Sequence, residues 1–137
     1  MTTPLVIERT FATPIERMWR ALTEKDALRE WYFSQLQQFE PTVGFEFRFT
    51  NDGSAYQKDW KVTEVIAGQK LAHTWAYKGY PGRSEVAFEL FDDGDKTILR
   101  VTHTGLESFP QDAHFARQRF EWGWRFIGDN LANFLAK

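Results

Sequence analysis

The chain has 137 residues, with 17 Lys or Arg against 19 Asp or Glu, so its formal net charge is −2. This length suits one hydrophobic core, and we expect a single domain over residues 1–137. Charges of both signs are interspersed along the sequence. That pattern lacks the basic patch of a nucleic-acid-binding protein, so we expect no nucleic-acid partner.

The sequence contains no cysteine, which excludes disulfides, thiolate metal sites and cysteine nucleophiles. No signal peptide is readable from Met1 to Ala12. No window approaches the roughly 18 apolar residues of a membrane span. We therefore expect a cytoplasmic protein that does not insert into a membrane.

Aromatic residues are abundant, at 17% of the chain. Rings are bulky and rigid, and they leave irregular gaps unless something fills them. This composition is compatible both with a pocket lined by rings and with a filled aromatic core.

The first predicted elements are a strand and two short helices. Apolar side chains alternate from Leu5 to Phe11, as in a strand. We expect a helix to begin at Thr13, with Pro14 at its first position and Glu16 completing a capping box. A second short helix follows from Thr23, and it carries Leu28, Trp31 and Tyr32.

Five further strands and a long helix complete the chain. The alternation predicts strands near residues 43–49, 56–66, 71–77, 86–90 and 97–104, separated by turns rich in Gly, Asp and Asn. Asp112 to Lys137 has the apolar periodicity of one long helix. This order predicts an α+β fold in which a curved six-stranded antiparallel sheet packs its concave face against the last helix.

Several motifs, in this order, resemble one family. Residues 7–23 read IERTFATPIERMWRALT, and Leu28 to Trp31 has the form Leu-x-x-Trp. Thr74-Trp75 follows a glycine turn, the segment from Thr97 to Gly105 has the form Thr-x-Leu-x-Val-x-His-x-Gly, and Gly123-Trp124 precedes Leu131. The chain thus resembles bacterial homologues of the activator of the heat-shock-protein-ninety ATPase. These belong to the helix-grip superfamily of START domains, the birch-pollen allergen and polyketide cyclases.

The resemblance implies a helix-grip fold with a cavity for an apolar or amphipathic molecule between the last helix and the sheet. It leaves two alternatives: a protein-interaction module that binds a chaperone, and a small cyclase or hydrolase that uses the same cavity. The eukaryotic activator has a further amino-terminal domain that 137 residues cannot also contain, so we do not expect chaperone activation. We expect a binding module and no self-sufficient enzyme, with no cofactor.

The expected cavity is lined by the inward faces of the strands and of the long helix. Trp31 is placed at its mouth. Gly123 either leaves room for a ligand or lets the helix approach the sheet closely. The proposed lining residues are Trp31, Phe45, Phe47, Trp60, Trp75, Phe88, Leu90, Val101, His103, Phe120, Gly123, Trp124 and Ile127.

The three histidines, His73, His103 and His114, are the candidates for acid–base chemistry or metal binding. They lie on different predicted elements without ligand spacing, so we expect no metal site. His103 shares a strand face with Leu99 and Val101 and is expected to point inward. A bond from His103 to a carboxylate would favour catalysis, whereas surroundings of rings alone would favour binding.

A second aromatic set, Phe115, Trp122 and Phe126, lies on the opposite side of the long helix. Exposed rings that lie together usually mark an interaction surface. We therefore predict a homodimer or partner contact there. The alternative is burial beneath residues 34–42 or 104–111.

Overall fold

The computed structural model describes residues 4–49, 57–110 and 117–137. In chain order, the first elements are β1 (Leu5–Phe11), α1 (Ile15–Thr23), α2 (Lys25–Trp31), β2 (Glu46–Phe49) and β3 (Lys58–Ile66). They are followed by β4 (Lys70–Trp75), β5 (Ser84–Asp93), β6 (Lys96–Thr104), the short 3-10 helix η1 (Leu106–Ser108) and α3 (Arg117–Leu135).

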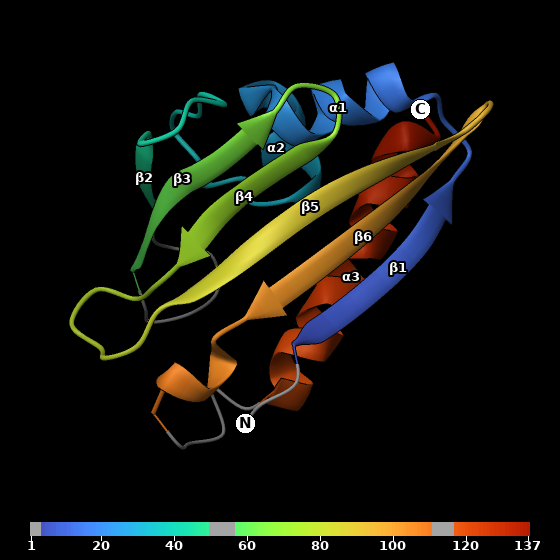
Figure 1. The fold of residues 1–137 in the computed structure, drawn as a ribbon. Helices are drawn as coiled ribbons and strands as arrows, with labels where there is room; N and C mark the ends of the chain where they lie inside the picture. The colour runs from blue at the N-terminus through green and yellow to red at the C-terminus, as the bar shows by residue number, and fades with distance from the viewer. Residues whose placement is uncertain (1–3, 50–56, 111–116) are drawn as a thin grey trace.

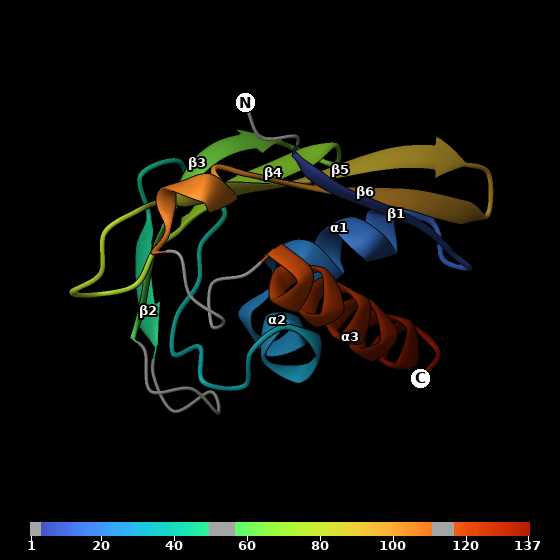
Figure 2. The same cartoon turned by 90° about the horizontal axis from the view of Figure 1, so that it is seen from below.

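The strands form one six-stranded antiparallel sheet in the order β1-β6-β5-β4-β3-β2. Figure 1 shows the twisted sheet with α3 lying across it, and Figure 2 shows α1, α2 and α3 all on one side of the sheet. In the second view β2 turns toward the helix side, which makes that face concave. The predicted α+β helix-grip architecture is confirmed.

Alternating burial fixes which side of each strand faces the helices. Along β5 the side chains of Val86, Phe88 and Leu90 are buried, and along β6 those of Val101 and His103 are buried. In the β5–β6 register Val86 is opposite His103 and Phe88 is opposite Val101. These strands therefore place rings and aliphatic chains together beneath α3, as the period-two pattern predicted.

The predicted start of the first helix is wrong. Helix α1 begins at Ile15, and Pro14 occupies the cap position without a side-chain cap bond. Thr13 is buried, its carbonyl accepts a bond of 2.8 Å from the Thr97 hydroxyl, and its own hydroxyl has no partner among the described residues. Because β6 holds Thr13 against the sheet, its side chain does not cap the helix.

Glycine turns separate the strands where the sequence predicted them. Gly94 has φ of 74° in the β5–β6 hairpin, and its N–H donates to the Asp92 carboxylate over 3.0 Å. Asp92, Gly94 and their neighbours thus form a turn. The turn predicted at residues 51–53 and the helix start predicted at Asp112 lie outside the described residues.

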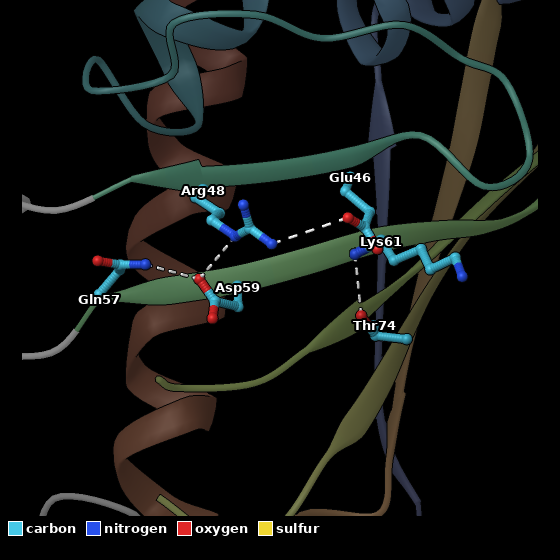
Figure 3. Close-up of polar contacts among 6 residues, drawn as sticks. All are labelled: Glu46, Arg48, Gln57, Asp59, Lys61 and Thr74. Carbon is cyan, nitrogen blue, oxygen red and sulfur yellow. Dashed lines mark hydrogen bonds and ion pairs between the residues drawn. The ribbon is translucent and has the colours of Figure 1, made fainter. Parts of the chain in front are cut away.

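The outward face of β2 and β3 is polar. As Figure 3 shows, the Arg48 guanidinium lies between Asp59, at 3.4 Å, and Glu46, at 3.8 Å. Gln57 also donates to Asp59 over 2.8 Å, while the Lys61 N–H donates to the Thr74 hydroxyl. The charged groups are exposed or half-buried, so their ion pairs contribute little to the stability of the fold.

Candidate functional site

A groove of about 590 Å³ opens between α2, with the segment that follows it, and α3. Its floor comes from the sheet, through Lys58, Trp75 and Tyr77. One wall is formed by residues 29–35, and the other by the face of α3 between Arg119 and Asn130.

The proposed lining residues divide into three groups. Six of them line the groove: Trp31, Trp75, Phe120, Gly123, Trp124 and Ile127. Phe88 and Val101 line a second hollow of about 330 Å³ between α3 and strands β1 and β6, where Trp31, Trp124 and Ile127 also contribute. The others, which line neither hollow, are Phe45, Phe47, Trp60, Leu90 and His103.

The residues that line neither hollow belong to the packed interior. Trp60 stacks on His73 with ring centroids 4.7 Å apart and lies 4.3 Å from the Trp75 ring. Phe47 meets Trp60 edge-on at 5.6 Å. Rings from β2, β3 and β4 thus fill the space at that end of the sheet, and the open volume lies nearer to α2 and α3.

The position predicted for Trp31 is wrong. Its side chain is 2% exposed, and its indole N–H donates to the Ala21 carbonyl over 2.8 Å. It therefore forms part of the deep wall shared by the two hollows and does not lie at the mouth. Because Trp31 ends α2, its ring turns inward to pack at 6.4 Å from the Phe88 ring.

Gly123 leaves room. Apart from its own helix backbone and chain neighbours, no atom of the described residues lies within 4 Å of the position that a Cβ would take there, and the residue borders the groove. A close approach of helix and sheet would place atoms at that position. Of the two alternatives for Gly123, the structure shows the one that leaves volume open.

His103 is fully buried among hydrogen-bond partners. The Trp124 indole N–H donates to its Nδ1 over 3.0 Å, so that nitrogen carries no proton. Its Nε2 therefore carries the proton and donates to the Ser84 hydroxyl at 2.6 Å, which in turn donates to the Trp75 carbonyl. Burial, together with repulsion from nearby His73, lowers the pKa of His103 to about 3.

His73 forms a second buried pair that the sequence did not reveal. Its Nδ1 donates to the Thr74 carbonyl over 2.7 Å, so its Nε2 accepts the Tyr32 hydroxyl proton over 3.0 Å. Burial lowers the pKa of His73 to about 4, although the bond to Thr74 acts in the opposite direction. Burial also raises the pKa of the Tyr32 hydroxyl well above its usual value.

These pairs hold neutral groups in place. The hydrogen-bond partners of His103 are a hydroxyl and an indole, and those of His73 are a phenol and a carbonyl. A general base near neutral pH needs a pKa close to 7, and both imidazoles lie well below that. Among the described residues, no group of three or more His, Asp or Glu could hold a metal ion.

Several groove residues were not proposed from the sequence. Tyr32 and Phe33 follow Trp31 directly, and this run of three rings at the end of a helix is a signal that could have placed them. The Tyr77 hydroxyl accepts the indole proton of Trp75, two residues earlier, over 2.8 Å. The remaining ones are polar or lie on α3: Arg29, Glu30, Ser34, Gln35, Lys58, Arg119, Phe126 and Asn130.

The second hollow is bridged by an ion pair. Arg9 interrupts the apolar side of β1, and its guanidinium meets the Asp129 carboxylate of α3 at 2.8 Å. Gly128 leaves space for the Arg9 side chain, because a Cβ at this position would lie 3.2 Å from the Arg9 Nη1. Both charged side chains remain partly exposed, so the pair joins β1 to α3 at the surface.

The outer side of α3 carries exposed rings. The side chain of Trp122 is 62% exposed and that of Phe126 is 67% exposed, so neither is buried under residues 34–42 or 104–110. Phe115 lies outside the described residues.

In the part of the chain that the structure describes, no helix combines the length and apolar character needed to cross a bilayer.

The chain is similar to proteins of known structure over nearly its whole length. A protein from Mesorhizobium loti has 29% identity and a TM-score of 0.84, with 98% of this chain and 97% of that chain covered. A protein from Rhizobium loti has 25% identity and a TM-score of 0.80, with 96% of each chain covered. The Aha1 dimer from Colwellia psychrerythraea, at 20% identity and a TM-score of 0.69, covers 93% of this chain and 92% of that one and shares the fold.

No curated protein sequence matches the chain significantly. The profile of one family, described as Activator of Hsp90 ATPase homolog 1-like protein, matches residues 12–136. That range includes every helix and strand described above except β1. The chain therefore belongs to the Activator of Hsp90 ATPase homolog 1-like family.

Proposed function

We propose that the chain binds an apolar or amphipathic small molecule in the groove between α2 and α3. The observation that carries this proposal is the open volume beside Gly123, about 590 Å³ within walls of aromatic rings. Small-molecule sites typically have volumes of about 300–1,000 Å³, mostly apolar linings and a few polar groups. The neutral, fully bonded histidines favour binding over catalysis.

Filling the groove tests the proposal. A leucine at Gly123 would project into the open volume without displacing backbone, because no atom lies within 4 Å of the new Cβ. We expect Gly123→Leu to weaken binding of N-phenyl-1-naphthylamine, a neutral fluorescent probe, at least tenfold, with unchanged circular dichroism. The matched control is Asn133→Leu, an exposed position of α3 that borders neither hollow. Equal affinity in Gly123→Leu and the parent would refute binding in this groove.

A homodimer through α3 is the second candidate, favoured by the exposed rings of Trp122 and Phe126. Two such faces would remove each other's rings from water. A relative of the same fold is described as a dimer. Binding to a chaperone and a cytoplasmic location stay predictions from the sequence.

Trp122 is the residue with which to test the dimer, because Phe126 also borders the groove. We expect the parent to sediment as a dimer at micromolar concentration and Trp122→Ser to sediment as a monomer. Probe binding should persist in Trp122→Ser, which separates the two proposals. A parent that is monomeric at all concentrations would end the dimer hypothesis.

A further inference from the structure

Cationic residues from three different elements line the groove. Arg29 comes from α2, Lys58 from β3 and Arg119 from α3, and all three line it. Among the described lining residues the acidic one is Glu30, whose carboxylate lies 3.2 Å from the Lys137 ammonium. The whole chain carries a net charge of −2, so this positive excess is local.

Two of these cations contact no carboxylate of the described residues. Elsewhere Arg9, Arg100 and Arg125 lie within 2.6 to 3.2 Å of a carboxylate. By contrast, Arg29 and Arg119 are exposed, and no ion pair holds either of them within the described part of the chain. Both arginines line the groove, one from each wall, and their guanidinium groups remain available to an incoming anion.

The third cation lies deeper. Lys58 is 5% exposed, and its ammonium lies 5.5 Å from the centroid of the Tyr77 ring on the groove floor. A cation over a ring face is attracted by the ring's quadrupole. The two exposed arginines attract an anionic group to the groove, where low-dielectric walls strengthen the field.

We propose that the ligand of this groove carries an anionic group, such as a carboxylate or sulfonate, on an apolar, ring-containing body. Arg29 and Arg119 bind the anionic group at the rim, because guanidinium N–H groups donate charge-assisted hydrogen bonds to anionic oxygens. The body packs against Trp31, Phe33 and Phe120. This inference rests on the proposed binding function and adds the chemical class of the ligand.

The test uses two probes that share one ring system. 8-Anilinonaphthalene-1-sulfonate is the sulfonated counterpart of neutral N-phenyl-1-naphthylamine. In the double variant Arg29→Gln/Arg119→Gln we expect the sulfonate to bind about five- to tenfold more weakly at low salt. The neutral probe should change by less than about twofold, and added salt should reduce the difference because it screens exposed charges.

The matched control is Arg20→Gln/Lys25→Gln. It removes two positive charges from exposed positions of α1 and α2 that do not line the groove, and it should leave both affinities unchanged. Equal weakening by the two double variants, or sulfonate binding unchanged by Arg29→Gln/Arg119→Gln, would overturn the inference and leave the groove as a neutral site. If Gly123→Leu affects neither probe, the binding proposal itself fails, and this inference fails with it.

Discussion

The two sides of α3 carry the same kind of side chain in opposite environments. Trp124 is 5% exposed, and its indole donates to His103 while its ring lies 5.7 Å from that of Trp75. Trp122, two residues earlier, is 62% exposed. Helix positions two apart point about 200° apart. One turn of α3 therefore places the Trp124 ring in the core and the Trp122 ring on the surface, where it could contact a partner.

The largest effect should come from truncating the inner ring. Trp124→Ala leaves a cavity between α3 and the sheet and removes the donor to the buried His103 Nδ1. We expect a loss of about 3–5 kcal/mol in the free energy of unfolding, measured by urea denaturation. Trp122→Ala, compared with the parent at a protein concentration low enough for both to be monomers, should change it by less than about 0.5 kcal/mol. Similar losses in the two variants would contradict the assignment of α3 to an inner and an outer side.

Acid should destabilise the folded protein through its two buried histidines. The pKa values of His73 and His103 are about 4 and about 3 in the folded protein, against 6.5 in an unfolded chain. Below pH 6.5 the imidazoles of the unfolded state bind protons, whereas those of the folded state stay neutral. The contribution of both histidines to the free energy of unfolding is therefore fully present above pH 6.5 and is lost as the pH falls toward 3. The two shifts together correspond to several kcal/mol.

NMR titration of the imidazole groups checks this directly. His73 should show the Nδ1-protonated tautomer and His103 the Nε2-protonated one, because of their hydrogen bonds. Neither set of resonances should titrate between pH 8 and pH 5.5. A midpoint near 6.5 for either histidine in the folded protein would show that its burial or bonding differs from this description.

The smallest effects should separate the two glycines of α3. Alanine stabilises a helix interior by about 0.5–1 kcal/mol relative to glycine. Gly123→Ala should show this gain, since its Cβ meets no atom within 4 Å. Gly128→Ala should gain less, because the Arg9 guanidinium lies 3.2 Å from the new Cβ. Thermal unfolding of both variants beside the parent measures the difference, and a larger gain at Gly128 would contradict it.

Regular alternation made the sheet predictable. Phe88, Leu90, Val101 and His103 were expected on the inner side of their strands, and all four are buried there. Local capping was a poorer guide, since Thr13 has the right residue type but its carbonyl is held by Thr97. A cap depends on where the neighbouring strand lies, which its own four residues do not specify.

The groove was only partly predictable. Inward-facing residues were identified, yet inward positions near β2 are filled by packed rings, whereas those beside Gly123 border open space. Arg29 and Arg119 are ordinary exposed arginines in the sequence, 90 positions apart. Only the packing of α2 beside α3 places both at one opening.

The sequence by itself determined the order of the elements, the inner and outer sides of each strand and the two aromatic sides of α3. These features follow from the periods of two and 3.6 residues, which depend on neighbours along the chain. The tertiary structure alone decided which rings meet, where volume stays open and how the histidines are bonded. Those features depend on distances between side chains such as Tyr32 and His73, which come from separate elements and meet only when the sheet curves around α3.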